Sequence, residues 1–198
     1  MKKERIAVIG SYAVGMTIVG DHFPIPGETV PGHDFLMCHG GKGSNQAVAA
    51  ARMGAEVVYG TCVGKDSFGD GAMKLYKEEQ IDAGAVRRSE KGLSTGVGLI
   101  YVNKEGENEI VIDFAANNEF SPEDVERMVP RLKECKLLLM QLESSMETVE
   151  YAAKTCKKLG IPFALNPAPF SPLSEELLGC CTYLTPNQTE ARLILGLD

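Results

Sequence analysis

Short apolar runs alternate with stretches of helical periodicity along most of this chain, and this alternation limits the possible folds more than any other feature. Continuous apolar runs of this length are typical of strands covered on both faces. The predicted strands are Ile6–Ile9, Val57–Cys62, Leu137–Met140, Phe163–Leu165 and Thr182–Leu184. The predicted helices are Ser44–Met53, Phe68–Glu79, Ser121–Glu134 and Val149–Leu159, and another begins near Gln188. The pattern favours an α/β fold, a doubly wound parallel sheet in which ligands bind beyond the carboxyl ends of the strands.

One region breaks the alternation. Thr95–Val102 and Glu109–Phe114 are β-rich runs on either side of the polar turn Asn103–Glu107, a pattern that predicts a β-hairpin. Met16–Val19 and His33–Met37 lie between Pro and Gly turns, show no helical period, and are predicted to be extended. Because a hairpin fits poorly into a parallel sheet, we assign it to a second, smaller sheet.

The composition is that of a globular protein, with 44% hydrophobic and 24% charged residues among 198. The formal net charge of −7 disfavours binding to nucleic acid or to an anionic membrane, although a local pocket can still hold a small anion. No apolar run approaches the ~20 residues of a membrane span, and the N-terminal residues do not form a signal peptide. The six cysteines lack metal-ligand spacing, so we expect reduced thiols, mostly in the core, and a cytoplasmic protein.

A glycine-rich segment, Gly40–Gln46, leads into the predicted helix 44–53, with Ser44 expected as its N-cap. Its glycines let a ligand approach the backbone, and the N-terminus of the helix attracts anions. Lys42 offers a cation and Asn45 a partner for hydroxyl groups. The spacing matches neither a Walker A loop nor a dinucleotide fingerprint, which argues against an NAD(P)-dependent oxidoreductase. A ligand-binding loop and a simple helix-capping turn both remain open.

Two further polar groups follow predicted strands. Glu143 comes just after Leu137–Met140, where it is either a ligand-binding carboxylate or an ordinary surface glutamate. Asn187 and Glu190 open the last helix, either as a capping box or as a polar pair that orients a hydrated Mg²⁺ near phosphates. The same two residues can do both. The three histidines form no hydrolase triad or metal-binding pattern, and we expect them on the surface or in a lid.

Seven segments with distinctive residues lie in order along the chain. The longest is Gly40–Ala51, with the residues GGKGSNQAVAAA, which is followed by Gly64 and Phe68–Gly69. The others are Phe23–Thr29, Ser94–Val97, Glu105–Asn108, Leu139–Glu143, Asn166–Pro169 and Thr185–Glu190. In this order they resemble the ribokinase (PfkB-type) family of carbohydrate kinases over essentially the whole chain.

The resemblance implies a ribokinase-like α/β domain over residues 1–198, with a β-sheet lid from about 12–20, 33–38 and 95–114. It implies ATP-dependent phosphorylation of a primary hydroxyl of a sugar such as ribose, with Mg²⁺ and often with K⁺. In this family the lid closes over the sugar and often packs against a partner's lid, so we expect a homodimer.

By position, the resemblance assigns sugar binding to Gly41, Lys42, Gly43, Asn45 and Glu143. It places Asn187 and Glu190 at the phosphates of ATP, with Glu190 contacting Mg²⁺ through water.

The chain departs from the family pattern in two ways. The Asn and Asp that bind sugar hydroxyls after the first strand are replaced by Ala13 and Gly15. Losing both hydrogen-bonding groups, at roughly 1–3 kcal/mol each, weakens ribose binding more than ~100-fold, so a different sugar or a nucleoside is an alternative substrate. The turn with the catalytic Asp is expected beyond residue 198, which makes this chain the N-terminal part of the fold and inactive alone. The alternative is a non-catalytic sugar-binding or interaction protein that dimerises through the lid.

Overall fold

The computed structural model describes residues 3–197, and its core is a six-stranded parallel sheet with the strand order β10-β9-β8-β1-β4-β5. Every strand pair in this sheet is parallel. The strands are β1 (Arg5–Ile9), β4 (Glu56–Val63), β5 (Asp82–Arg88), β8 (Leu138–Met140), β9 (Phe163–Leu165) and β10 (Tyr183–Leu184). The predicted α/β fold with a parallel sheet is therefore confirmed, because parallel strands require crossover connections and helices supply them here.

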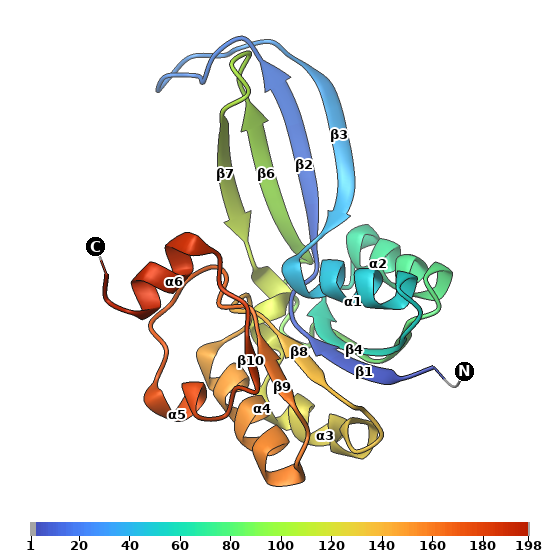
Figure 1. Ribbon diagram of the computed structural model, residues 1–198. Coiled ribbons are helices and arrows are strands. Elements are labelled where there is room, and N and C mark those ends of the chain that lie inside the picture. Colours follow the sequence, from blue (N-terminus) through green and yellow to red (C-terminus); the bar gives the residue numbers. More distant parts are fainter. Residues whose placement is uncertain (1–2, 198) are drawn as a thin grey trace.

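Helices cover both faces of this sheet (Figure 1). On one face lie α1 (Lys42–Arg52) and α2 (Ser67–Glu78), which pack against alternate residues of the strands such as Val8 and Tyr59. On the other lie α3 (Pro122–Leu132) and α4 (Met146–Leu159), which pack against Ala7 and Val58. Successive side chains of a strand point to opposite faces, so two separate hydrophobic cores form, one on each side.

The second sheet, which we call the lid, has the order β3-β2-β6-β7 and stands above the α/β body in Figure 1. Its strands are β2 (Ala13–Gly20), β3 (Gly32–Gly40), β6 (Gly96–Val102) and β7 (Asn108–Asp113). The predicted hairpin is β6–β7, an antiparallel pair. Strand β6 also pairs with β2 in parallel, and β2 pairs with β3 in the antiparallel direction. The hairpin is thus outside the central sheet, as expected.

Several element boundaries differ from the prediction. Helix α1 begins at Lys42 with Gly41 as its N-cap, so the expectation of Ser44 as N-cap is wrong. Ser44 is buried within the helix, where its hydroxyl accepts a hydrogen bond from Tyr76 at 3.1 Å. The lid strands β2 and β3 extend further than Met16–Val19 and His33–Met37, because their backbone pairing continues past the apolar residues.

Three elements had no predicted counterpart. Strand β5 is at the edge of the sheet and only partly buried, so it lacks a continuous apolar run. The 3-10 helix η1 (Ala115–Glu119) and the four-residue helix α5 (Glu175–Leu178) are too short to show a period. Two predicted helix ends are confirmed, because Gly160 adopts φ of 70° after α4 and Asn187 caps α6 (Gln188–Ile194).

Four of the six cysteines are buried, in line with the expected core role. Over residues 3–197, no helix combines the length and apolar character that crossing a bilayer requires.

Candidate functional site

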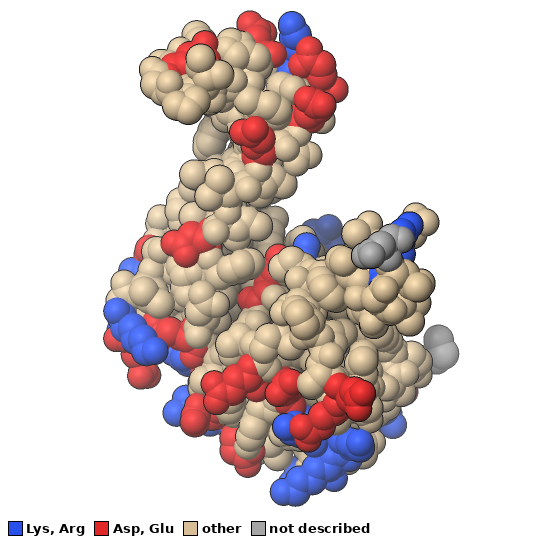
Figure 2. Space-filling view, turned by 90° about the vertical axis from the view of Figure 1, so that its left-hand side faces the viewer, with Lys and Arg blue, Asp and Glu red and all other residues tan. Residues whose placement is uncertain are grey.

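A cleft of about 290 Å³ lies where the lid meets the α/β body. Its floor is the carboxyl edge of the parallel sheet, where ligands bind in open α/β folds. Figure 2 shows the hollow beneath the lid. The lining residues come from the ends of β1 and β8, the start of α1 and the inner face of the lid, and they include Ser11, Ala13, Gly15, Cys38, His39, Gly41, Asn45 and Glu143.

Glu143 is the carboxylate at the centre of the floor, and it is only 8% exposed. Its Oε2 accepts hydrogen bonds from the Ser11 hydroxyl and from the backbone N–H of Lys42, the latter at 2.8 Å. Its Oε1 lies 3.8 Å from the Lys42 ammonium. One carboxylate therefore joins the end of β1, the end of β8 and the N-terminus of α1, where the helix dipole favours a negative charge. This finding excludes the interpretation of Glu143 as an ordinary surface glutamate.

The glycines of the segment 40–46 act mainly through close backbone contacts. Gly41 has φ of 90°, and a Cβ there would lie 2.6 Å from the carbonyl oxygen of Ser11. Gly43 is buried inside α1, and a Cβ there would lie 2.6 Å from the Cα of Gly10. Only glycine allows α1 to start this close to the end of β1. Gly41 lines the cleft, whereas Gly43 lies behind it and does not.

The helix N-terminus is also less free than expected. The Lys42 N–H is bound to Glu143, and the Ser44 N–H donates to the carbonyl of Ser11 at 2.9 Å. Asn45 is different, because its exposed side chain lines the cleft without a hydrogen-bond partner among residues 3–197. Its amide is the polar group most available to an incoming ligand, since it both donates and accepts.

Ala13 and Gly15 of β2 also line the cleft, on the lid side. The structure thus brings together five of the positions singled out in the sequence, Ala13, Gly15, Gly41, Asn45 and Glu143, and adds Lys42 through its contact with Glu143.

Asn187 and Glu190 do not line this cleft. They form the expected capping box at α6, with the Asn187 N–H donating to Glu190 at 2.8 Å and the Glu190 N–H donating to the Asn187 side chain at 2.8 Å. Each Glu190 carboxylate oxygen accepts one hydrogen bond, from the N–H or the side-chain amide of Asn187. Each oxygen keeps a lone pair, which fits a water-mediated contact to Mg²⁺. Within residues 3–197 no cluster of three or more potential metal ligands occurs, so direct multidentate coordination has no support there.

Two important residues had no assigned role at the sequence level. Ser11 is only 1% exposed and orients Glu143; its position two residues after β1 was the available signal. Asn117, in η1, had no signal, because its importance arises from a contact across 105 residues. It accepts from the Tyr12 N–H and donates to the Tyr12 carbonyl, both at 2.8 Å. Tyr12 is where β1 leads into the lid, so Asn117 anchors the base of the lid.

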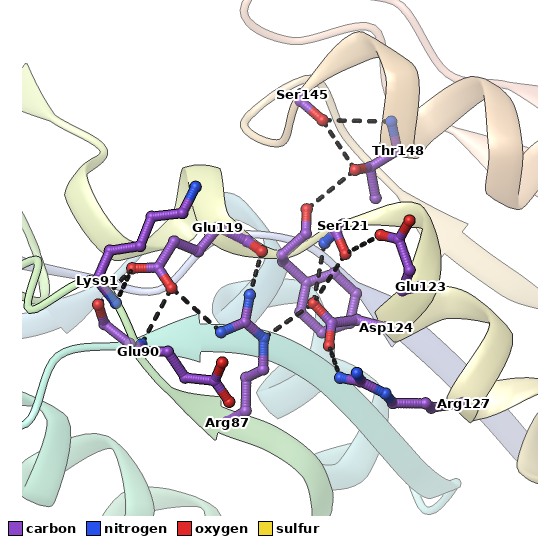
Figure 3. Close-up of polar contacts among 12 residues, drawn as sticks. Arg87, Glu90, Lys91, Glu119, Ser121, Glu123, Asp124, Arg127, Ser145 and Thr148 are labelled. Atoms are coloured by element: carbon purple, nitrogen blue, oxygen red, sulfur yellow. Dashed lines mark hydrogen bonds and ion pairs between the residues drawn. The ribbon is translucent and has the colours of Figure 1, made fainter.

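A buried ionic network fixes η1 in place (Figure 3). Arg87 of β5 donates to Asp124 at 2.8 Å and to Glu119 at 3.2 Å. Glu119 also accepts from the Ser89 hydroxyl and from the N–H groups of Glu90 and Lys91. Burial alone would raise the pKa of Glu119, but these hydrogen bonds outweigh it and lower the pKa below its ordinary value. The ionised Glu119 therefore ties the edge strand to the helix that carries Asn117.

The side chain of Tyr12 also stabilises the base of the lid, from the side of the sheet that α1 and α2 cover. Its hydroxyl lies 2.6 Å from Nδ1 of His39 on β3, and its ring packs edge-on against Tyr76. Burial, helped by the charge of Asp66, raises the pKa of Tyr12 to about 12, so the phenol stays neutral at physiological pH. His39 is thus a lid residue, as are the positions around it in β3.

Comparison with known proteins agrees with this arrangement. The model of the pfkB family of carbohydrate kinases matches residues 3–198. Ribokinase from Haemophilus influenzae is 39% identical over 196 residues, which cover 99% of this chain and 64% of that protein. Deoxyribokinase from Salmonella typhimurium is 39% identical, covering 97% of this chain and 63% of that protein.

Among solved structures, ribokinase from Arabidopsis thaliana in complex with ribose and ATP has a TM-score of 0.88 at 26% identity. That match covers 98% of this chain and 64% of the plant protein. The chain spans slightly less than two thirds of the length of the curated relatives that it matches. The matched segment includes both the central sheet and the lid, and on this basis the chain belongs to the pfkB family of carbohydrate kinases.

Proposed function

We propose that this protein is an ATP-dependent kinase that phosphorylates a primary hydroxyl of a sugar or sugar derivative. One observation carries the proposal: Ser11, Asn45 and Glu143 converge from β1, α1 and the end of β8 in a single cleft beneath the lid. Sugar hydroxyls both donate and accept hydrogen bonds, and this floor offers an amide, a hydroxyl and a carboxylate. The carboxylate of Glu143 offers an oxygen that accepts hydrogen bonds, and the side-chain amide of Asn45 offers an N–H group that donates them.

The remaining site residues receive supporting roles. Gly41 and Gly43 bring the α1 backbone close to the cleft, and the Lys42 ammonium supplies positive charge near Glu143. Asn187 and Glu190 face the phosphates of ATP, with Glu190 holding Mg²⁺ through water, which is how Mg²⁺ commonly binds near phosphates. Mg²⁺ would neutralise charge on the transferred phosphoryl group. We include K⁺ in the proposed activity without naming a ligand for it among residues 3–197.

The catalytic base is not assigned to a residue of this chain, which spans about 64% of the Haemophilus influenzae relative. We therefore propose that residues 1–198 act as one α/β domain that supplies the sugar site and the lid. In this proposal the chain binds substrate but does not turn over alone. The reduced, mostly buried cysteines are compatible with the cytoplasm as its place of action.

The test measures ADP formation with a panel of sugars and nucleosides, using the product of the complete gene. Asn45→Ala should raise KM at least ~10-fold with little change in melting temperature, because its side chain has no hydrogen-bond partner in the part of the chain that the structure describes. Asn118→Ala, an exposed asparagine outside the cleft, is the matched control and should change neither. Equal kinetics for the two variants would remove Asn45 from the site, and no turnover on any substrate would contradict the kinase proposal.

The alternative is a non-catalytic protein that binds a sugar and dimerises through the lid. Calorimetry on the same panel separates the two functions, because this alternative predicts binding without ADP formation.

We also propose that two lids pack against each other in a homodimer. The outer lid face, which we define as Met16, Ile18, Phe35, Leu99 and Val111, surrounds a groove of about 360 Å³. Three of its side chains are more than half exposed, including Val111 at 70%. Apolar surface that is contiguous and exposed in this way favours association.

A further inference from the structure

A hydrogen bond between two glutamines joins the end of β8 to α1 just outside the cleft. The side-chain amide of Gln141, the residue directly after β8, donates from Nε2 to Oε1 of Gln46 on α1 at 2.5 Å. Neither glutamine lines the cleft, but each is close in the chain to a residue that does. Gln46 follows Asn45, and Gln141 precedes Glu143 by two positions. The bond can therefore influence the cleft without touching a ligand.

The amide of Gln141 is only half satisfied, although the side chain is completely buried. Its exposed fraction is 0%, and its Oε1 has no hydrogen-bond partner among residues 3–197. This oxygen lies against Gly10 at the end of β1, where an added Cβ would come within 2.0 Å of it. A buried polar atom without a partner destabilises a fold, whereas an apolar side chain of similar size would not. What the amide provides is therefore the bond to Gln46 and not a gain in stability.

This bond gives α1 a second attachment to the segment that follows β8. The first attachment is Glu143, which accepts from the backbone N–H of Lys42 at 2.8 Å. The second is Gln141, which binds Gln46 one helical turn further along. Residues four apart lie on the same face of a helix, so both attachments hold one side of the first turns of α1. Two attachments restrict rotations of this part of the helix that a single one allows, and Asn45 belongs to the same turn.

We infer that Gln141 and Gln46 are positioning residues of the substrate site, whose bond fixes where the amide of Asn45 lies relative to the carboxylate of Glu143. The inference rests on the proposed kinase function and extends it to two residues that do not contact the substrate. A displacement of about 1 Å in such supporting groups can lower a rate by ~100-fold. Loss of the bond should therefore weaken substrate binding even though every side chain that lines the cleft is kept.

The first experiment measures kinetics and melting temperatures of Gln141→Met and Gln46→Met, using the product of the complete gene and the substrate that it phosphorylates best. Both variants should raise KM for that substrate at least ~5-fold and leave KM for ATP within ~2-fold of wild type. The melting temperature of Gln141→Met should equal or exceed that of wild type, because methionine removes the buried unpaired oxygen. Gln46→Glu keeps an accepting oxygen and should restore most of the affinity. Gln80→Met, at an exposed glutamine outside the cleft, is the matched control and should leave both KM values unchanged.

Three results would overturn the inference while leaving the kinase function intact. The first is an unchanged KM in both methionine variants. The second is a lower melting temperature with KM raised equally for substrate and ATP, which would indicate a general loss of structure. The third is a KM for Gln46→Glu as high as that for Gln46→Met, which would attribute the effect to packing and not to the hydrogen bond.

The second experiment does not depend on turnover. Hydrogen exchange of the Lys42 backbone amide, followed by NMR, reports how often its bond to Glu143 opens. This amide should exchange at least ~5-fold faster in Gln46→Met than in wild type, with the amides of the central sheet unchanged. If no compound is phosphorylated, the kinase proposal fails, and this exchange rate decides whether the glutamine bond holds the start of α1 against Glu143. An unchanged rate would overturn the inference.

Discussion

At Gly41 the chain passes from β3 into α1 with φ of 90° and ψ of 131°, a backbone conformation that residues other than glycine rarely adopt. The position is also crowded, because the backbone of residues 11–13 occupies the place of a Cβ. Gly54, after α1, has φ of 98° and nothing within 4 Å of its virtual Cβ. Both glycines have a strained backbone conformation, but only Gly41 is crowded. Comparing substitutions at the two positions therefore separates the cost of strain from the cost of crowding.

We expect Gly54→Ala to cost about 1–2 kcal/mol in free energy of unfolding, the usual cost of a left-handed conformation. Gly41→Ala should cost more, about 3 kcal/mol or above, since overlap with backbone atoms is added to the strain. Urea denaturation of both variants measures the difference. If both variants lose the same free energy of unfolding, the backbone of residues 11–13 moves away from the new Cβ of Gly41→Ala without a measurable loss of stability.

Asn117 gives a second prediction at the scale of single residues. Its amide donates to two carbonyl oxygens, those of Tyr12 and Phe114, both at 2.8 Å. Asn117→Asp replaces this donor by a second acceptor and leaves buried carbonyls facing a carboxylate, which should cost about 2–4 kcal/mol. Asn118→Asp, exposed next to it, should stay within ~0.5 kcal/mol of the wild type. Thermal unfolding checks both, and similar values for the two would show that Asn117 does not anchor the lid.

At the scale of elements, Asp66 joins helix α2 to the lid. As N-cap its side chain accepts from the Gly69 N–H at 2.8 Å, and it accepts from the Thr95 N–H and hydroxyl at 2.7 Å, just before β6. Partial burial would raise the pKa of Asp66, but the hydrogen bonds from Thr95 and Gly69 outweigh it, and the pKa lies below its ordinary value. The ionised form is therefore the form that stabilises the junction.

A lowered carboxyl pKa contributes stability that is present above the unfolded pKa, about 3.9, and is lost as the pH falls through the folded value. Asp66→Asn should thus be less stable than wild type by ~1 kcal/mol at pH 7, with the gap shrinking below pH 4. Asp21→Asn, at an exposed aspartate just after β2, serves as the control. Denaturation curves from pH 7 to pH 3 test this, and a gap independent of pH would rule out the charge as the cause.

At the scale of the whole molecule, the lid is a thin sheet with apolar side chains on both faces, one above the cleft and one facing outward. Val111→Lys places a charge on the outer lid face and should convert the proposed dimer into a monomer. Met53→Lys alters a side chain that is 90% exposed on the body and should leave the mass unchanged. Light scattering after size-exclusion chromatography gives the masses. A wild-type monomer, or a dimer that survives Val111→Lys, would refute lid-to-lid packing.

The sequence was sufficient for the overall architecture because local patterns report local conformations. Apolar runs such as Ile6–Ile9 predicted buried strands, and the polar turn 103–107 predicted the hairpin that became β6–β7. Edge strand β5 was missed because it is covered on only part of its surface and so carries no apolar run. Glu143 was identified as a candidate because the carboxyl ends of parallel strands share one edge, and Asn45 because it lies in a glycine-rich segment that leads into a helix.

The chain's order of strands and helices thus specified a parallel sheet with a separate lid, and it specified which polar residues reach the edge between them. Folding alone decided that α1 starts at Lys42 and not at Ser44, since Glu143 accepts the Lys42 N–H from 101 positions away. It likewise decided that Asn117 holds Tyr12 across 105 positions of the sequence. Local propensity acts over a few residues, whereas these features depend on contacts that exist only once distant segments have packed together.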